Sequence, residues 1–366
     1  MTESAASISP NETVRFISDR SNGRDNNFNL IRILAASGVL VSHAYPISLG
    51  RAATQPLENL LHGLTLGTVC VWIFFAISGF FITRSFNRKQ SVTSFLIARV
   101  LRLFPALAVV LGVTIFVAGF VLTNVAPSLY WAETGEYFVR NMLLFDLRYT
   151  LPGVFESNPG GAGINGSLWS LSYEVTCYVG VFICGLLGLL RNRKVFAGAV
   201  LLFMCIYAAT MVLDLNTRIE QLAKLGLTFL TGMVFYIWRD KIPLSWVVLA
   251  GVTAATVVAW FTPLFMPVFA VSLSYAVFFA GYAKIPLLLN YNRLGDYSYG
   301  VYIYAFPIQQ LVAQSGVTTP VINMAISLPF TFICAILSWH LVEAPAMKLR
   351  HRIKAPKRAK AKQIAK

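Results

Sequence analysis

The chemistry available to this sequence lies in a few ionisable side chains set inside long apolar segments. Arg32 and His43 occur in the first of these segments, eleven residues apart. Eleven residues make close to three turns of α-helix, which places both side chains on one helix face, about 16 Å apart along the axis. A charged residue within a membrane span is costly and by default indicates a functional site. Two structural alternatives stay open: snorkelling of Arg32 to lipid headgroups, and a polar tie between helices through His43.

A second basic pair, Arg99 and Arg102, occurs three residues apart in the segment RVLRLFPAL and shares one helix face. Guanidinium groups bind phosphate through a fixed fork of donors. With Arg32, this pair could therefore hold the phosphates of a nucleotide-like carrier at a membrane mouth. The general accumulation of positive charge on the cytoplasmic side of membranes is the alternative explanation.

Glu174 lies in the segment NGSLWSLSYEV, seven residues into the fourth apolar run and at a depth similar to that of His43. A carboxylate beside an imidazole fixes its tautomer and supports its action as a general base. We therefore hypothesise that Glu174 and His43 pair across two helices. The remaining ionisable positions within apolar runs include Asp296, His340 and Glu343.

The composition indicates that most of the chain lies in lipid. Hydrophobic residues make up 57% and charged residues 12% of the 366 residues, and the mean hydropathy is +0.65, whereas soluble domains contain about 45–50% apolar and 25% charged residues. About 20 apolar residues span a hydrocarbon core. We predict an all-α polytopic membrane protein with about ten transmembrane helices. The predicted spans are 28–48, 65–83, 101–123, 167–190, 195–213, 222–238, 244–261, 264–283, 296–314 and 318–342.

The positive charges predict the orientation of these spans. Most of the 30 Lys and Arg residues fall on one side of the predicted membrane, and short cytoplasmic loops accumulate such residues. Both termini are therefore expected to be cytoplasmic, with a polar N-terminus over 1–27, a membrane domain over 28–345 and a basic tail over 346–366. Residues 1–27 contain no apolar signal-peptide core, so the first span is expected to direct insertion.

The net charge of +15 follows the membrane rather than any nucleic-acid motif. We expect the basic tail to be attracted to anionic lipid headgroups and predict no nucleic-acid partner. The five cysteines lie in apolar runs without metal-type spacing, so we expect small buried side chains, no metal site and no bound cofactor. The long outer connection 124–166 ends in the flexible run SNPGGAGINGS and is expected either to cover an outward-facing site or to be disordered.

Six motifs follow one another along the chain between about Asn29 and Arg350. They are Arg32 with His43, FFAISGF at 74–80, Arg99 and Arg102 followed by Pro105, WSL-x-x-E from Trp169 to Glu174, SYGVY at 298–302, and Glu343 with Pro345. In this order the motifs resemble acyltransferase family 3, the bacterial multi-pass membrane acyltransferases.

The resemblance implies an O-acyltransferase of the bacterial cytoplasmic (inner) membrane. It implies transfer of an acyl group, usually acetyl from acetyl-CoA, to a hydroxyl of a cell-surface carbohydrate acceptor. Arg32, Arg99 and Arg102 would engage the acyl-CoA donor, and His43 would serve as base, with a covalent acyl-histidine as the variant. Many relatives carry a second histidine after the SY-x-x-Y motif, where this chain has Ala305. His43 is then the only expected base.

Alternatives from other classes stay open at this point. A transporter or flippase also places charges within the membrane, but the chain has no clear inverted repeat of the kind that many transporters carry. An assembly subunit without activity is a further reading, given the absent second histidine. The sequence leaves open the identity of the acceptor, acetyl against succinyl as the acyl group, and the oligomeric state.

Overall fold

The computed structural model describes residues 15–21, 23, 25–88, 92–213, 215–285 and 289–349. Within these ranges the chain is helical and contains no strand, apart from one isolated bridge between Phe16 and Pro243. The all-α prediction is therefore confirmed for the described residues. Most of the predicted polar N-terminus and all but the first residues of the predicted basic tail lie outside them.

Most helices follow the predicted apolar runs. The helices are α1 Ile17–Arg20, α2 Phe28–Leu49, α3 Leu66–Arg88, α4 Val92–Val113, α5 Phe120–Leu122, α6 Pro127–Leu143, α7 Leu168–Leu186, α8 Arg193–Val212, α9 Thr217–Ile237, α10 Trp246–Ala259, α11 Phe265–Tyr282, α13 Ser298–Gln314 and α14 Pro320–Ser338. Helices α1 and α6 lie outside the predicted runs, and α4 begins nine residues before the predicted span 101–123. A π-helical turn at Thr114–Gly119 joins α4 to α5, another at Trp339–Glu343 follows α14, and a 3-10 turn at Asn290–Arg293 precedes α13.

Seven helical stretches among the described residues are long and apolar enough to cross a membrane. Each of the ten predicted spans does contain a helix, but α9, α10 and α13 do not meet these criteria of length and composition. The count of ten spans and the sides of the termini stay predictions. Helix α6 falls inside the connection 124–166, for which the sequence had indicated no helix.

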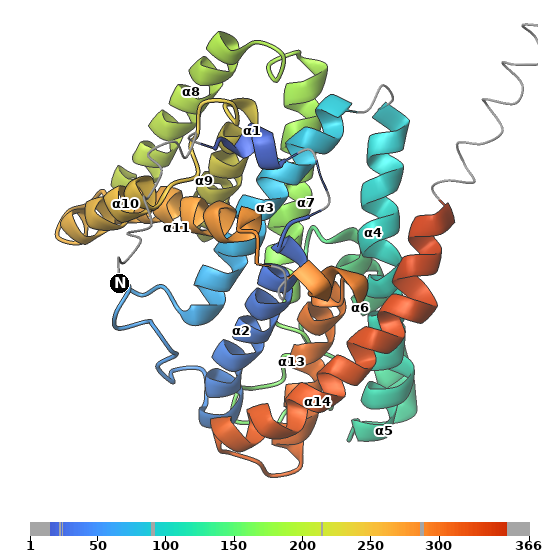
Figure 1. The fold of residues 1–366 in the computed structure, drawn as a ribbon. Helices are drawn as coiled ribbons and strands as arrows, with labels where there is room; N and C mark the ends of the chain where they lie inside the picture. Colours follow the sequence, from blue (N-terminus) through green and yellow to red (C-terminus); the bar gives the residue numbers. More distant parts are fainter. Residues whose placement is uncertain are drawn as a thin grey trace, which may run out of the picture.

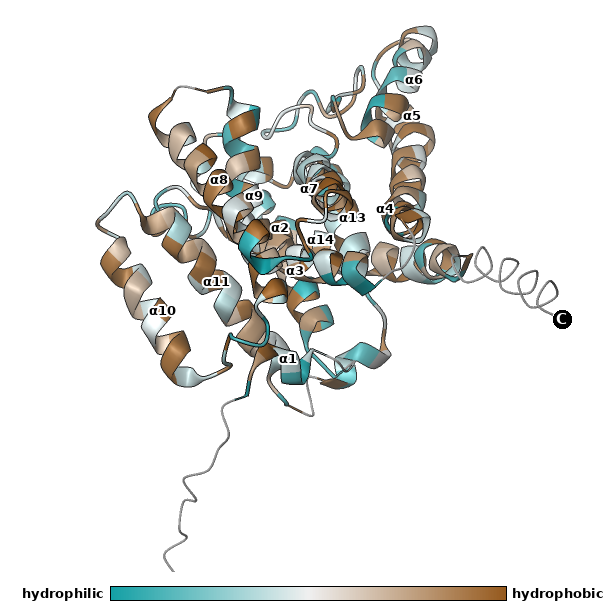
Figure 2. Cartoon of the chain, turned by 90° about the horizontal axis from the view of Figure 1, so that it is seen from above, coloured by the Kyte–Doolittle hydropathy of each residue, from teal (hydrophilic) through white to brown (hydrophobic). Residues whose placement is uncertain are grey.

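Helices α2, α3 and α13 form the centre of the bundle, whereas α8 and α10 lie at its periphery (Figure 1). About 67% of the apolar stretch of α3 is buried, against 17% of that of α8. The outward faces carry large apolar side chains, and the ribbon of outer helices such as α8 and α10 is brown at its hydrophobic residues in Figure 2. Such faces suit contact with lipid. Cys70 is buried, but Cys205 is exposed on α8, so the expected burial of every cysteine is wrong.

The closest helix pairing joins α3 to α9. A Cβ atom added to Gly79 would collide with the carbonyl of Phe229, and one added to Gly232 would collide with the carbonyl of Ala76. Small residues let helix backbones approach in this way inside membranes. This contact fixes α3, which carries one wall of the site described below.

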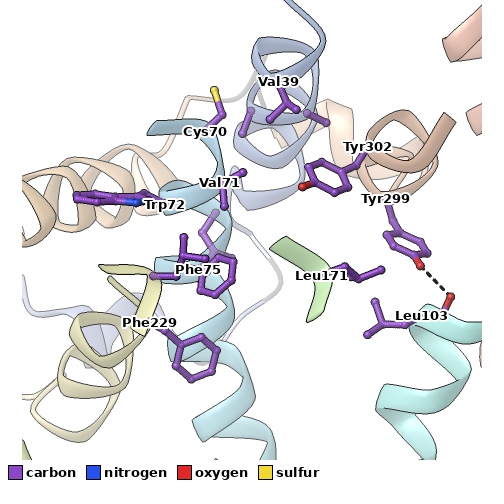
Figure 3. Close-up of a cluster of buried hydrophobic side chains, with 14 of the residues drawn as sticks. Val39, Cys70, Val71, Trp72, Phe75, Leu103, Leu171, Phe229, Tyr299 and Tyr302 are labelled. Carbon is purple, nitrogen blue, oxygen red and sulfur yellow. Dashed lines mark hydrogen bonds between the residues drawn. The ribbon is translucent and has the colours of Figure 1, made fainter. Parts of the chain in front are cut away.

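Side chains from six helices meet in the core of the bundle (Figure 3). In this view Trp72 of α3 lies at the left of the cluster, Leu171 of α7 toward the right and Val39 of α2 at the top. Tyr299 of α13 donates a hydrogen bond from its hydroxyl to the carbonyl of Leu103 on α4, at 2.9 Å. The core therefore holds α4 and α13 together through a satisfied polar contact as well as through apolar packing.

We name the two ends of the bundle by what is found there. The basic end is where α2, α4 and α13 begin and where α3 and α7 end. The loop end is the opposite one, where α2 and α13 end and the connection between α6 and α7 packs on them.

Candidate active site

A cavity of about 870 Å³ opens at the basic end and runs into the bundle. Its walls come from α2, α3, α4, α7 and α13. Along α3 the lining residues run from Arg88 at the mouth to Val71 inside, a helical rise of about 25 Å. Basic side chains line the outer part, and hydroxyl and aromatic groups line the inner part. The side chains used below are Arg32, Arg84, Arg88, Arg99, Arg102, Phe74, Ser78, Ser170, Glu174, Tyr178 and Tyr302.

Glu174 lies on the wall of this cavity, where α7 faces α3. Its Oε1 atom accepts hydrogen bonds from Ser78 at 2.8 Å and from Tyr178 at 2.5 Å. Its other oxygen, Oε2, has no hydrogen-bond partner in the described part of the chain. The carboxylate is therefore held in place by one oxygen while the other can accept from a bound ligand.

A second hydroxyl pair closes the inner end of the cavity. Ser170 and Tyr302 lie 2.5 Å apart through their oxygens, and the Tyr302 hydroxyl also contacts the carbonyl of Ser167 at 2.9 Å. The Phe74 ring packs edge-on against Tyr302 at 5.8 Å between centroids. These contacts place the start of α7 deep within the bundle, beside α13.

An ionic cluster ties together the helices around Arg102. Its guanidinium nitrogens lie 2.7 Å from Asp296 and 3.1 Å from Glu343, and Arg32 approaches the same oxygen of Asp296 at 2.5 Å. Serine hydroxyls on α13 and α14 also donate to these carboxylates. Glu343 is only 1% exposed, so its charge depends on Arg102 for compensation. Arg102 is therefore engaged by two acids.

Three further arginines lie on the cavity wall. The guanidinium of Arg99 lies over the ring of Tyr178 at 5.8 Å, and that of Arg84 over the ring of Phe81 at 5.9 Å. Arg88 is the exposed last residue of α3. In the sequence, Arg84 and Arg88 count only among the positive charges that orient the spans. Their position at the end of the helix that carries the FFAISGF motif is the signal that could have placed them in the site.

His43 does not line the cavity but lies close to its inner end. On α3, Val71 is the innermost lining residue, and Gly67, one helical turn or about 6 Å further on, packs against Ser42 beside His43. The imidazole packs edge-on against Phe306 at 5.2 Å. Its buried Nδ1 atom has no hydrogen-bond partner among the described residues, which leaves this atom available to a water or an acceptor hydroxyl.

The loop end above His43 is closed by the connection that precedes α7. Asn158 donates hydrogen bonds to the carbonyl and the side-chain oxygen of Gln310, and Gln310 donates to the carbonyls of Gly161 and Gly163. Further along, a Cβ atom on Gly166 would lie 2.6 Å from the ring of Phe306, the same ring that contacts His43. The expected cover over the site is thus an ordered segment packed onto α13.

The structure brings some of the predicted site residues together and keeps others apart. Arg32, Arg99, Arg102 and Glu174 share one cavity. The hypothesised pair between Glu174 and His43 is absent, because α7 starts deep in the bundle and turns Glu174 toward Ser78 on α3. Ala305, in place of the second histidine of relatives, is buried.

The comparisons with known proteins agree with this geometry. A family model described as an acyltransferase domain matches residues 25–340. The chain belongs to this acyltransferase family. It is similar to an "O-acetyl transferase" of Shigella phage Sf6, with 30% identity over 87% of this chain and 95% of the relative. It is also similar to "Nodulation protein 10" of Rhizobium leguminosarum bv. viciae, with 27% identity over 91% and 96% of the two chains. No solved structure gives a significant match.

The sequence prediction of an O-acyltransferase is confirmed by this family and by its relative in the phage. The matched region of the acyltransferase family includes α2, α3, α4, α7 and α13, the five helices that form the cavity walls. It ends before Glu343, the acid that anchors Arg102. Membership also supports a multi-pass membrane protein, in agreement with the seven apolar helices.

Proposed function

We propose that this acyltransferase moves an acyl group, acetyl in the simplest case, from acyl-CoA to a hydroxyl of a cell-surface carbohydrate in the bacterial inner membrane. One observation carries the proposal: a cavity with an arginine-rich mouth reaches Tyr302, one helical turn of α13 before Phe306, whose ring packs against His43. Such a cavity separates a binding region for an anionic carrier from a region where a neutral group can react.

The donor enters this cavity from the basic end, which faces the cytosol where acyl-CoA is available. The arginines that line this end of the cavity outnumber the acids and give it a positive potential, which concentrates anionic ligands. The long CoA arm then follows α3 inward. Its amide groups pass Glu174, whose Oε2 atom can accept a hydrogen bond, and its thioester reaches the pair of Ser170 and Tyr302.

The reaction joins the thioester to an acceptor hydroxyl beside His43. The imidazole removes the hydroxyl proton while the hydroxyl oxygen attacks the thioester carbonyl carbon. The carbon–sulfur bond breaks, and the CoA thiolate receives the proton from the imidazolium. The Ser170 hydroxyl can turn from Tyr302 to donate to the carbonyl oxygen as negative charge develops there, while Tyr302 keeps donating to the carbonyl of Ser167. Glu174 supports the site from the cavity rather than as the hydrogen-bond partner of His43.

The acceptor approaches from the loop end, so the two substrates meet from opposite sides. The phage relative is named an O-acetyl transferase, which supports acetyl as the acyl group and an oxygen as the accepting atom. A carbohydrate acceptor agrees with the resemblance described above. The ordered segment that covers Phe306 must move for a glycan to reach His43.

The test uses purified protein in proteoliposomes with donors labelled in the acyl group. Radiolabelled acetyl-CoA and succinyl-CoA are supplied on one side with a mixture of lipid-linked and free glycans, and ester formation is followed by mass spectrometry. We expect base-labile acetyl esters that form only with protein present. Movement of glycan across the membrane without ester formation would contradict the proposal and indicate a transporter. Label retained on His43 after a single turnover would replace direct transfer by an acyl-histidine intermediate.

A further inference from the structure

Four arginines on the cavity wall form an inner and an outer group. Arg32 and Arg102 form the inner group, and both contact carboxylates of Asp296 or Glu343. Two cations and two anions leave this group close to neutral. A phosphate that took Arg102 away from Glu343 would leave a carboxylate that is 1% exposed without its cation, at a large cost.

The outer group, Arg84 and Arg88, lies at the end of α3, and the surroundings of Arg84 differ from those of the inner group. In the described part of the chain no carboxylate lies within ion-pair distance of Arg84. The charged side chains that act on it electrostatically are Arg88 and Arg239, and the phenols of Tyr236 and Tyr282 lie nearby. The fold thus holds several positive groups close together at the mouth of a cavity. Like charges placed in this way gain most from an anion between them.

We infer that Arg84 and Arg88 hold the phosphates of the nucleotide end of the acyl donor, while Arg102 acts as a structural anchor for α4, α13 and the turn after α14. The inference rests on the proposed function and adds to it the residues that bind the anionic end. It assigns the phosphate contacts to residues outside the RxxR motif.

The length of the cavity agrees with this assignment. Ser78 lies six residues before Arg84 on α3, a rise of about 9 Å, and Val71 lies about 20 Å from Arg84. Phosphates at the mouth therefore leave the inner part of the cavity to the uncharged arm and the thioester. Phosphates at Arg32 and Arg102 would sit beside Asp296, which repels them.

Lipid headgroups carry phosphate as well, so the experiment must separate the two sources. The variant is Arg84→Gln with Arg88→Gln, and the matched control is Arg191→Gln with Lys194→Gln, which changes two exposed cations outside the cavity. Each protein is reconstituted in phosphatidylcholine vesicles with and without phosphatidylglycerol. Rates are measured with acetyl-CoA and with acetyl-pantetheine, which lacks the nucleotide phosphates, and inhibition is measured with adenosine 3′,5′-bisphosphate.

We expect the Arg84 and Arg88 variant to lose about 10- to 100-fold in kcat/KM for acetyl-CoA, mainly through KM, because charge-assisted contacts to phosphate are lost. Inhibition by the bisphosphate should weaken by a similar factor, turnover of acetyl-pantetheine should stay unchanged, and the control should match the wild type. Equal losses with both donors, losses that follow phosphatidylglycerol content, or unchanged inhibition would overturn the inference. Absence of turnover by the wild type with either donor would instead contradict the proposed function.

Discussion

Polar side chains near the two ends of α2 have contrasting surroundings. At the basic end, Arg32 lies on the wall of an open cavity among charged partners. Near the loop end, His43 lies beneath a closed segment held by neutral amides and glycine carbonyls, and its Nδ1 atom has no partner. Charge needs water or counter-charge, whereas neutral hydrogen bonds can close a protein interior completely. This contrast agrees with the proposed function, in which the basic end binds the anionic donor and the loop end shields the reaction at His43 from water.

The largest effect on activity is expected from a substitution near the loop end. Replacement His43→Ala removes the proposed base and should lower the rate of acyl transfer by about 10²- to 10⁴-fold, the range of acid–base catalysis. His62→Ala provides the control, because His62 lies in the connection between α2 and α3 and packs on Trp260. Initial rates are compared at equal amounts of inserted protein. Wild-type rates in His43→Ala would remove this residue from the mechanism.

At the basic end, the main expected effect of a substitution at Arg102 is a loss of stability. Arg102→Gln leaves the buried Glu343 without its cation, and loss of one partner of a buried pair costs about 3–5 kcal/mol. Arg193→Gln breaks an exposed pair with Asp240 and should cost less than about 1 kcal/mol. Thermal unfolding in detergent measures both variants. If Arg102→Gln melts like the wild type but loses affinity for the donor, the assignment of Arg102 as an anchor is wrong.

The acidic partners of Arg102 also show which contacts the sequence could not predict. The apolar runs predicted the helices well, because about 20 apolar residues can satisfy their backbone in lipid only as helix. The sequence also identified Asp296 and Glu343 as unusual, but not as partners of Arg102. The contacts join positions 194 and 241 residues apart, and only the packing of α4 against α13 and the turn after α14 brings them together.

The missed pairing of Glu174 has a related cause. Depth was judged from the position of Glu174 in its apolar run, but the start of α7 is set by Tyr302 and Ser170 on neighbouring helices. Helix α6 was missed because charged residues interrupt its sequence. Its acids and arginines are satisfied by ion pairs within the connection, such as those of Arg148 with Glu133 and Glu136.

The substitution Glu174→Gln should have an effect of intermediate size on activity. Glutamine keeps an oxygen that can accept from Ser78 and Tyr178 but removes the charge. Loss of a charged acceptor for the donor should lower kcat/KM by about 10- to 100-fold, with little change in unfolding temperature. Steady-state kinetics with acyl-CoA measure the effect, and Thr176→Val on the exposed face of α7 is the control. Full activity in Glu174→Gln would exclude a role for its charge.

The smallest effect should appear in the cover over His43. Gln310→Leu removes the donor to Gly161 and Gly163 and leaves Asn158 without its acceptor side chain, at a cost of about 1–3 kcal/mol. Because this cost falls on one segment, it should raise the population of its open form rather than unfold the protein. A reporter cysteine in place of Ile164, which is fully buried in the same segment, should then react about 5- to 30-fold faster with a polar thiol reagent.

The control for this last change lies on the same helix. Gln314→Leu replaces an exposed glutamine at the end of α13, so it alters the surface without touching the cover. Equal reactivity of the Ile164→Cys reporter in both backgrounds would mean that the glutamine contacts do not keep the segment closed. Faster labelling with Gln310→Leu alone, together with faster transfer to a bulky glycan, would identify opening of this segment as the step that admits the acceptor to His43.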